Sequence, residues 1–530
     1  MVRVNNIKIK PDYTDAELKK AVAKKLRISA SNIKSLSIFK RSLDARDKSD
    51  IRYVITADAE IEGNEKKLIK SNKDASEASY PIYTMPEKVR MEKRPVVVGF
   101  GPAGMFAAYI LAHAGTKPIV LERGECVEKR MESVNHFWKT GDLKENSNVQ
   151  FGEGGAGTFS DGKLNTGIKD PRIRKVLETF VEKGAPEDIL YDAKPHIGTD
   201  RLPETVKNIR EEIVSLGGEV LFESTFTGLK IENGSLASIS YTDSEGSNKD
   251  IETNDVVIAL GHSSRDTFKM LYDSGLVMEQ KPFAVGVRIE HLAEDINISQ
   301  LGEHYHDWDL PTADYKLSTH LEDGRGVYSF CMCPGGEVVG ATSIKGHVVT
   351  NGMSNNSRDG KNSNAAILVG LNPEDFNSDD VFAGMNFQEE LEKKAYIIGG
   401  ESYHAPAQRQ EDFMLKRKTE SFGRVNPSYQ PGVTPSNIWD VLPELVCSSI
   451  AEALPHFAKK IKGFDDPDAV LTAPETRSSS PVRIKRDIDG QAIGIKGIYP
   501  CGEGAGYAGG ITSAAVDGIK IAESILKKYE

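Results

Sequence analysis

One segment constrains the fold of this chain more than any other, PVVVGFGPAGMFAAYILAHAGTKPIVLERG at residues 95–124. The continuous apolar run at residues 96–98 is typical of a buried parallel strand. A glycine-rich turn follows at once, and the residues after it have the composition of a helix that ends at Gly115. A second apolar run, PIVL, completes a strand–helix–strand unit. This order predicts an α/β fold with a Rossmann-type parallel sheet.

The glycines of the turn have the spacing G-x-G-x-x-G, and each has its own task. Gly99 permits the tight turn, Gly101 leaves room for a pyrophosphate, and Gly104 lets helix and strand pack closely. The pyrophosphate would lie at the start of the helix, where free N–H groups and the helix dipole favour anions. Glu122 follows Gly104 by 18 residues, at the position expected to bind a ribose hydroxyl pair. A carboxylate there repels a 2′-phosphate, so the segment predicts NAD or FAD rather than NADP.

Two later segments favour FAD. Residues 497–526, GIYPCGEGAGYAGGITSAAVDGIKIAESIL, combine a strand, an acidic-glycine turn and a helix with a glycine-rich start. They resemble the second fingerprint of large FAD enzymes, in which an acid (here Glu503) meets the ribityl chain and a helix that starts near Gly509 faces the flavin. Between the two fingerprints, TNDVVIALGHSSRDTF resembles the strand that returns to the dinucleotide fold, with Gly261 at its turn. Three ordered segments predict that the first glycine loop binds FAD.

The chain resembles the glutathione-reductase-like FAD superfamily, and within it a group of bacterial FAD-dependent dehydrogenases with an added amino-terminal domain. The residues that carry the resemblance are VVGFGPAGMFAA, FGEGGAGTFSDGKLNT, ALGHSSRDTF, KPFAVGVRIEH and YPCGEGAGYAGGITSAA. They span roughly residues 80 to 530. The resemblance implies the cofactor and the fold more than the substrate.

Carried onto this sequence, the resemblance implies a set of FAD contacts. Glu122 would bind the adenosine ribose, Arg130 would meet the pyrophosphate, and the main chain of Phe226 would pair with adenine. The loop at residues 154–158 would lie along the phosphates and the isoalloxazine and donate backbone N–H groups. The last acid of the pattern is commonly Asp, and Glu503 departs from it. The full predicted set is Gly99, Gly101, Pro102, Ala103, Gly104, Glu122, Arg123, Arg130, Gly154, Gly155, Ala156, Gly157, Thr158, Phe226, Ala259, Gly261, Gly502, Glu503, Gly509, Gly510 and Ile511.

Three cations are candidates for catalysis. Arg288, Lys163 and Arg477 lie in glycine-, serine- or strand-rich surroundings that we expect to approach the flavin. A fixed cation there would stabilise an anionic reduced flavin or orient a substrate carboxylate. For each of them an ordinary structural salt bridge remains the alternative. His262 directly follows Gly261 and is a candidate proton donor.

The cysteines and histidines admit simpler interpretations. Five cysteines, at 126, 331, 333, 447 and 501, form no disulfide framework and fit a reducing compartment. The Cys331-Met332-Cys333 stretch is a candidate redox pair, but two half-buried thiols are the favoured interpretation, and a packing role is favoured for Cys501. The group of His304, His306 and Asp307 has no further ligands at fixed spacing, so no metal site is expected.

The chain is predicted to divide into three parts. Residues 1–90 form a small α+β module together with its linker. The module, at residues 1–75, has a strand–helix–strand–strand order that suggests a ferredoxin-like arrangement, and the linker spans residues 76–93. Residues 91–284 plus 465–530 form a discontinuous FAD-binding domain with three layers, two of β and one of α. Residues 285–464 form an inserted α+β substrate or cap domain, so that the ligand cleft lies between domains.

The composition excludes several classes of function. The net charge of −11 argues against nucleic acid as an obligate partner, although residues 1–75 carry 18 Lys and Arg against 11 Asp and Glu. That excess favours a solvated helix face, with docking of an acidic redox partner or RNA as alternatives. No run of apolar residues is long enough to span a bilayer and no signal peptide is expected, so a cytoplasmic location is predicted.

We therefore expect an oxidoreductase that moves a hydride or electron pair between a small organic substrate and non-covalently bound FAD. No second G-x-G-x-x-G follows a strand, so NAD(P)H would act only as a transient donor without a domain of its own. A flavin monooxygenase, an FAD-dependent RNA-modifying protein and a non-catalytic redox sensor remain the alternatives.

Overall fold

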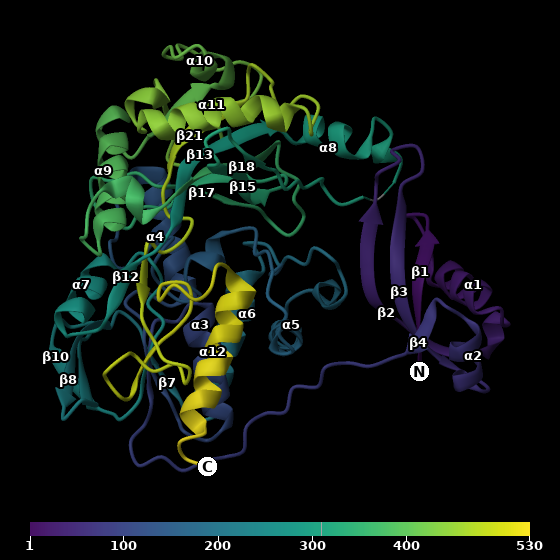
Figure 1. The fold of residues 1–530 in the computed structure, drawn as a ribbon, viewed down its shortest axis with the longest axis horizontal. Coiled ribbons are helices and arrows are strands. Elements are labelled where there is room, and N and C mark those ends of the chain that lie inside the picture. Colours follow the sequence, from purple (N-terminus) through teal and green to yellow (C-terminus); the bar gives the residue numbers. More distant parts are fainter. Residues whose placement is uncertain (309) are drawn as a thin grey trace.

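The structure, a computed structural model, describes residues 1–308 and 310–530. Three sheets carry most of the architecture, and they lie in different parts of the molecule (Figure 1). A parallel sheet lies at the lower left of that view, a larger sheet lies above it, and the amino-terminal module lies to the right.

The parallel sheet has the strand order β23-β11-β5-β6-β7. Its last strand comes from the carboxyl-terminal part of the chain and completes the sheet beside β11. The mixed α/β class with a parallel sheet is confirmed. The five strands are β5 (Val96–Val98), β6 (Ile119–Leu121), β7 (Glu219–Leu221), β11 (Val256–Ile258) and β23 (Ile498–Pro500).

The side chains of each strand in the parallel sheet alternate between two covering layers. Val97 packs into an apolar cluster with a layer of helices, whereas Val96 and Val98 pack into a second cluster with a small antiparallel sheet and α7. Both faces are therefore covered, which explains the continuous apolar runs. The helical layer contains α3 (Pro102–His113), α5 (Arg172–Glu182), α6 (Leu202–Ser215) and α12 (Ile511–Leu526), and the second layer contains β8 (Thr225–Glu232), β9 (Ser235–Thr242), β10 (Asn248–Glu252) and α7 (Arg265–Asp273).

The larger sheet has seven strands in the order β14-β15-β18-β13-β21-β19-β20. Its strand β21 corrects the predicted boundary at residue 465, because residues 470–475 pair with β13 and β19 and not with the parallel sheet. The strands are β13 (Phe283–Leu292), β14 (Ser318–His320), β15 (Gly326–Cys333), β18 (Asn362–Leu371), β19 (Ala405–Arg409), β20 (Val433–Pro435) and β21 (Val470–Glu475). Around it lie α8 (Ala293–Leu301), α9 (Ala383–Ile398), α10 (Gln410–Met414) and α11 (Glu444–Ala458).

Short elements connect these layers. Strands β12 (Met278–Gln280) and β22 (Val482–Ile484) form one antiparallel pair, and β16 (Glu337–Gly340) and β17 (Thr350–Met353) form another. Helix α4 (Val127–Thr140) follows the first strand–helix–strand unit, and one face of it packs against β16 and β17 through Phe137 and Trp138.

The amino-terminal module has the element order β-α-β-β-α-β and the sheet order β2-β3-β1-β4, the arrangement of a ferredoxin-like motif. The last helix and strand of this module were not predicted, because the polar run at residues 62–77 lacks a clear apolar period. Asn64 caps this helix by accepting a hydrogen bond from the Lys67 amide. The elements are β1 (Val2–Ile9), α1 (Asp15–Leu26), β2 (Ile33–Asp44), β3 (Arg52–Ile61), α2 (Glu65–Ser71) and β4 (Ala75–Glu77).

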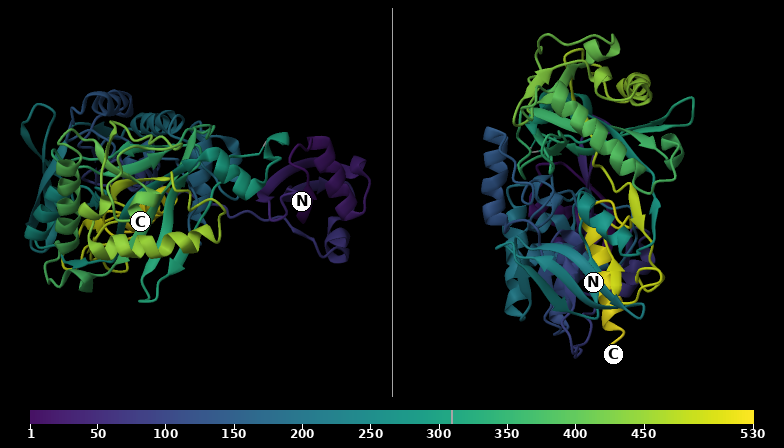
Figure 2. Two further views of the ribbon diagram at one scale, coloured as in Figure 1. Left: turned by 90° about the horizontal axis from the view of Figure 1, so that it is seen from above. Right: turned by 90° about the vertical axis from the view of Figure 1, so that its left-hand side faces the viewer.

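This module lies beside the rest of the molecule and contacts it through its β2–β3 hairpin (Figure 2). The Arg41 guanidinium pairs with both carboxylate oxygens of Asp192, at 2.7 and 2.9 Å. Ile51, at the far end of the hairpin, is 1% exposed and belongs to the apolar core that the seven-stranded sheet shares with α11. Residues 78–95, which contain no helix or strand, join the module to β5. None of the helices among the described residues combines the length and apolar content that crossing a bilayer requires.

Candidate cofactor site

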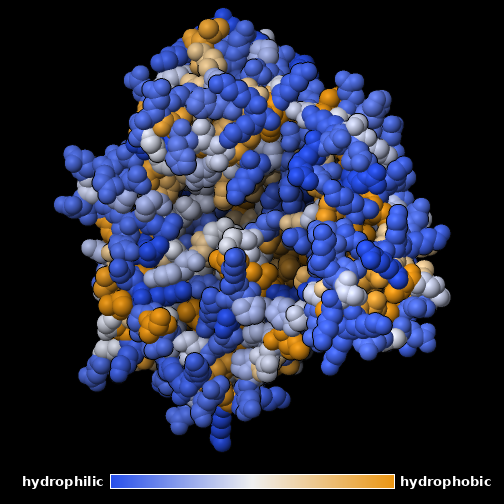
Figure 3. Space-filling model, turned by 45° about the vertical axis from the view of Figure 1, so that its right-hand side comes forward, coloured by the Kyte–Doolittle hydropathy of each residue, from blue (hydrophilic) through white to orange (hydrophobic). Residues whose placement is uncertain are grey.

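A cavity of about 350 Å³ opens where β5, β6, β11 and β23 end. The carboxyl ends of parallel strands are the usual place for a ligand in such a sheet. Figure 3 shows a hollow on one face of the molecule, with hydrophilic side chains around it and paler or apolar surface inside. The cavity brings together most of the predicted cofactor residues: Gly99, Gly101, Pro102, Ala103, Glu122, Arg123, Gly155, Ala156, Gly157, Phe226, Ala259, Gly261, Glu503, Gly509, Gly510 and Ile511.

Two helices begin at this cavity without a side-chain cap. Gly101 is the N-cap of α3 and Gly510 is the N-cap of α12, and neither end has a side-chain hydrogen bond to its first amides. The first N–H groups of a helix have no partner within the helix, so both ends offer donors to a ligand. Both N-caps line the cavity. An extended molecule with acceptors at two places, as FAD has, fits this arrangement.

Glycine is required at the first turn for steric reasons. Gly99 has φ +92°, and a Cβ there would lie 2.4 Å from the carbonyl oxygen of Ala259. At Gly104 a Cβ would lie 1.9 Å from the Gly99 carbonyl oxygen, so helix and strand approach each other as the sequence predicts. Gly101 differs, because the nearest atom to its Cβ would be Gly155 Cα at 3.7 Å. The space beside Gly101 is thus free of protein atoms and available to a ligand.

Glu122 lies at the end of β6 and organises the loops around the cavity. Its carboxylate accepts hydrogen bonds from the amides of Phe100, Gly124 and Gly152 at 2.8, 2.9 and 3.0 Å. A carboxylate offers about four acceptor positions, so capacity remains for a ribose hydroxyl. Glu122 therefore connects the glycine turn to the crossover loop in addition to lining the cavity.

The structure corrects the predicted role of Arg130. Its side chain is fully buried and donates only to carbonyl oxygens, namely those of Asn148, Val149, Gly152, Glu153 and Gly155 at 2.6–3.2 Å. Burial lowers the pKa of Arg130 to about 10. The guanidinium lies behind the loop and holds its shape, so the expected direct contact with a pyrophosphate is wrong.

Four further predicted residues lie behind the cavity wall. The Gly154 amide donates to the Phe100 carbonyl, and the Thr158 hydroxyl donates to the Glu153 carbonyl. The Gly502 amide donates to Asp517. Together with Gly104 these residues support the loops and do not line the cavity.

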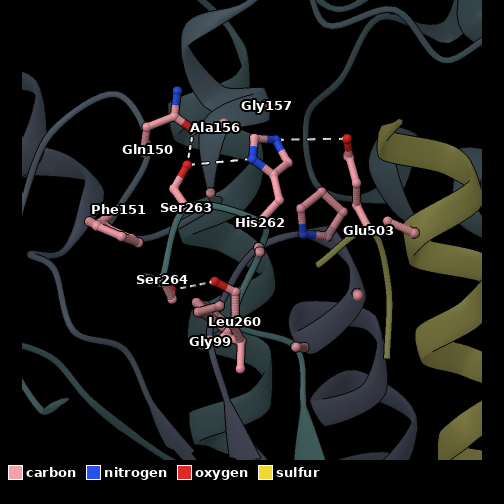
Figure 4. Close-up of a pocket in the computed structure, with 18 of the residues that line it drawn as sticks. Gly99, Gln150, Phe151, Ala156, Gly157, Leu260, His262, Ser263, Ser264 and Glu503 are labelled. Atoms are coloured by element: carbon pink, nitrogen blue, oxygen red, sulfur yellow. Dashed lines mark hydrogen bonds and ion pairs between the residues drawn. The ribbon is translucent and has the colours of Figure 1, made fainter. Parts of the chain in front are cut away.

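A chain of polar side chains crosses the cavity (Figure 4). The Ser263 hydroxyl donates to Gln150 at 3.0 Å and lies 3.5 Å from His262 Nδ1, while His262 Nε2 lies 3.8 Å from Glu503 Oε1. Burial lowers the pKa of His262 to about 3 and raises the pKa of Glu503 to about 7. The imidazole is therefore neutral at pH 7, and the carboxyl group is the member of the pair that changes protonation near neutral pH.

The three candidate cations take different positions. Lys163 and Arg477 line the cavity, each held by a buried carboxylate: Lys163 by Asp161 at 2.5 Å and Arg477 by Glu392 at 2.7 Å. Arg288 does not line the cavity and lies one layer behind it, so its predicted approach to the flavin is wrong.

Arg288 acts through neighbours that do line the cavity. Its guanidinium pairs with Glu475 at 2.9 and 3.1 Å, and it donates to Asn351 Oδ1 and to the Cys331 carbonyl oxygen at 3.1 and 2.8 Å. The neighbouring Glu475 carboxylate outweighs the cost of burial and raises the pKa of Arg288. The arginine therefore positions three groups of the cavity wall.

The partners of these cations could not be identified from the sequence. Asp161 accepts from Arg358 at 2.5 and 2.9 Å, and these bonds, together with Lys163, hold the pKa of the buried aspartate well below its usual range. Arg358 lies about 200 residues away in the sequence, so only its fold position reveals the pairing. Among the described residues, His, Cys, Asp and Glu side chains form no group of three that could hold a metal ion.

Parts of the chain match known protein families, and one relative matches its whole length. Residues 282–478 match the family described as FAD-dependent protein, C-terminal domain-like, and residues 1–60 match a domain of unknown function. An uncharacterized protein of Clostridium beijerinckii is 47% identical over 535 residues, which cover 100% of this chain and 99% of that protein. The chain belongs to the same family as this uncharacterized protein, and its residues 282–478 belong to the FAD-dependent protein, C-terminal domain-like family.

Solved structures similar to this chain resemble it only distantly. Quinol fumarate reductase FrdA of E. coli is 12% identical, with a TM-score of 0.38 over 82% of this chain and 70% of that one. A flavoprotein/dehydrogenase of Cytophaga hutchinsonii is 14% identical, with a TM-score of 0.36 over 84% of this chain and 80% of that one.

Proposed function

We propose that the protein is an FAD-dependent oxidoreductase that moves a hydride or electron pair between a small organic substrate and non-covalently bound FAD. The observation that carries this proposal is the pair of uncapped helix starts at Gly101 and Gly510, which open into one cavity. Glu122 and Glu503 lie at separate places along the same cavity wall. This spacing suits a dinucleotide whose ribose meets Glu122 and whose flavin end lies near α12.

Bound FAD supplies the two-electron chemistry, and the chain positions and protects it. Lys163 and Arg477 are held rigidly by their carboxylate partners, so a substrate carboxylate or carbonyl meets donors that need no reorganisation. The Glu503 carboxyl group has a pKa of about 7, and its Oε1 lies 3.8 Å from His262 Nε2. This pair is therefore the proton donor and acceptor of the site. NAD(P)H would serve only as a transient electron donor.

The test begins with an anaerobic visible spectrum of the purified full-length protein, before and after reconstitution with FAD. Oxidised-flavin absorbance that is released on heating supports the proposal, and its absence after reconstitution refutes it. Titration with NADH and NADPH then identifies the donor. Rapid bleaching by either one indicates a reductase, whereas bleaching by dithionite alone means that the substrate or a protein is the donor.

A matched pair of variants separates ligand binding from folding. Gly101→Ala adds a methyl group that meets no protein atom closer than 3.7 Å, so the flavin-free variant should be as stable as the wild type. The methyl group occupies the space beside the helix start, so FAD affinity should fall about tenfold or more, since each tenfold loss corresponds to about 1.4 kcal/mol. The control is Gly326→Ala, where a Cβ has nothing within 4 Å.

A further inference from the structure

Two cysteines meet at the edge of the cofactor cavity. Cys331 lines the cavity, and Cys333, two residues further along β15, is fully buried. The pairing of β15 with β18 shifts register between Phe330 and Cys333, and Cys331 has φ +39°, so the strand is bulged at this point. The Cys333 thiol approaches within 3.3 Å of the Cys331 carbonyl oxygen.

The surroundings make the two thiols unequal. A hydrogen bond from Cys333, together with the charges of Arg288 and Lys163, lowers the pKa of Cys331 to about 6. The same contact and burial raise the pKa of Cys333 well above its ordinary value. Arg288 donates to the Cys331 carbonyl, and the Lys163 ammonium donates to the Met332 carbonyl, so both cations are fixed against this stretch. At neutral pH the pair is therefore one thiolate and one thiol.

The remaining cysteines lack this combination. Burial raises the pKa of Cys447 to about 12 and that of Cys501 well above its ordinary value. Cys126 lies at the start of α4 and does not line the cavity. A reactive cysteine needs thiolate character and access, and Cys331 combines both. Phe330 beside it also lines the cavity and is 37% exposed, so the thiolate lies near the cavity mouth.

We propose that Cys331 and Cys333 form a dithiol/disulfide pair that exchanges an electron pair with the bound flavin. This inference rests on the proposed function, because it needs FAD in the cavity. On oxidation of the pair, the Cys333 S–H bond breaks and the bond between the two sulfurs forms. The two electrons and the one proton released reduce the oxidised flavin to its anionic two-electron form. In the opposite direction, reduced flavin opens the disulfide and restores one thiolate and one thiol.

The first measurement asks whether the disulfide forms. Full-length protein with bound flavin is treated with diamide, blocked with iodoacetamide and digested with trypsin. Cleavage after Arg325 and Lys345 releases one peptide, residues 326–345, which holds both cysteines and no other. We expect this peptide to carry no alkyl group after diamide and two alkyl groups after prior reduction. Two alkyl groups in both samples would overturn the inference.

The second measurement counts electrons. Anaerobic dithionite titration of the diamide-treated holoprotein should consume about four electrons per flavin, two for the flavin and two for the disulfide. Cys331→Ser and Cys333→Ser should consume about two, and the control Cys126→Ser about four. If the wild type binds flavin but consumes only two electrons per flavin, the cysteine inference is refuted and the proposed function is not. If the protein fails to bind flavin after reconstitution, the proposed function is refuted as well.

A rate comparison assigns the exchange to the flavin. In flavin-free protein, dithionite should open the disulfide at least about tenfold more slowly than in the holoprotein, because the partly buried disulfide then lacks the flavin that passes electrons to it. Equal rates would overturn the role of the flavin. The peptide and rate measurements use wild-type protein, so a cysteine variant that fails to fold does not remove the test.

Discussion

Replacing Glu503 by glutamine removes a carboxylate that the fold holds in an unfavourable place. Burial raises the pKa of Glu503 from 4.5 to about 7, so the folded state keeps a proton that the unfolded state has released. The contribution of this group to stability is fully present below pH 4.5 and is lost as the pH rises through 7. Glutamine does not titrate, so the Glu503→Gln variant keeps its stability as the pH rises. It should therefore become more stable than the wild type at higher pH.

The size of the effect follows from the two pKa values. A pKa shift of this size limits the difference in the free energy of unfolding between Glu503→Gln and the wild type to about 3 kcal/mol above pH 8. The side chain is 26% exposed, so solvent screening reduces the expected difference to about 2 kcal/mol at pH 8–9. At pH 5 the difference should be less than about 1 kcal/mol, because the unfolded carboxylate is then only partly ionised.

The assay is urea unfolding of flavin-free wild type and Glu503→Gln at pH 5, 7 and 9, with the exposed Glu303→Gln as the control. Subtracting the two free energies of unfolding at each pH cancels the contributions of other titrating groups. A difference that is constant from pH 5 to pH 9, or one that favours the wild type at pH 9, would refute the raised pKa assigned to the partly buried Glu503 carboxyl group.

Three further changes test other parts of the structure. Gly104→Ala places a Cβ 1.9 Å from the Gly99 carbonyl oxygen and should reduce flavin retention in gel filtration, with Gly326→Ala unaffected. Glu392→Ala leaves the buried guanidinium of Arg477 unpaired and should lower the free energy of unfolding by about 3–5 kcal/mol, measured in urea; a loss below about 1 kcal/mol would contradict the pairing. Arg41→Ala removes a bidentate contact with Asp192 and should weaken docking of the amino-terminal module by about 1 kcal/mol, seen as faster proteolysis within residues 78–95.

The parallel sheet and its cavity could be predicted because their signals are local. Three short apolar runs, each followed by glycine, specify strands β5, β11 and β23, and Gly99, Gly261 and Gly509 lie at the cavity as the sequence predicts. The spacing of Glu122 from the glycine turn likewise indicated its place at the end of β6. In each case the motif contains both the strand and the residues that the strand presents.

The cations could not be placed in the same way, because their partners come from distant parts of the chain. Arg130 was expected to meet a phosphate, yet a single arginine on a helix gives no sign that five carbonyl groups surround it. Arg288 lies on an apolar strand, and only the packing of β13 against β21 reveals its pairing with Glu475. The boundary near residue 465 failed for a related reason, since β21 has the same apolar composition as a strand of the other sheet.

The position of β23 in the parallel sheet affects how the protein is made. β23 pairs with β11 although it follows about 240 residues later in the chain. During translation, at roughly 5–20 residues per second, the edge of β11 therefore stays unpaired until nearly the whole chain has emerged from the ribosome. An unpaired strand edge is prone to pair with other chains, so nascent chains should depend on chaperones for this interval. Helix α12 also arrives last, so a cofactor that needs both helix starts can associate only after synthesis of the sheet is complete.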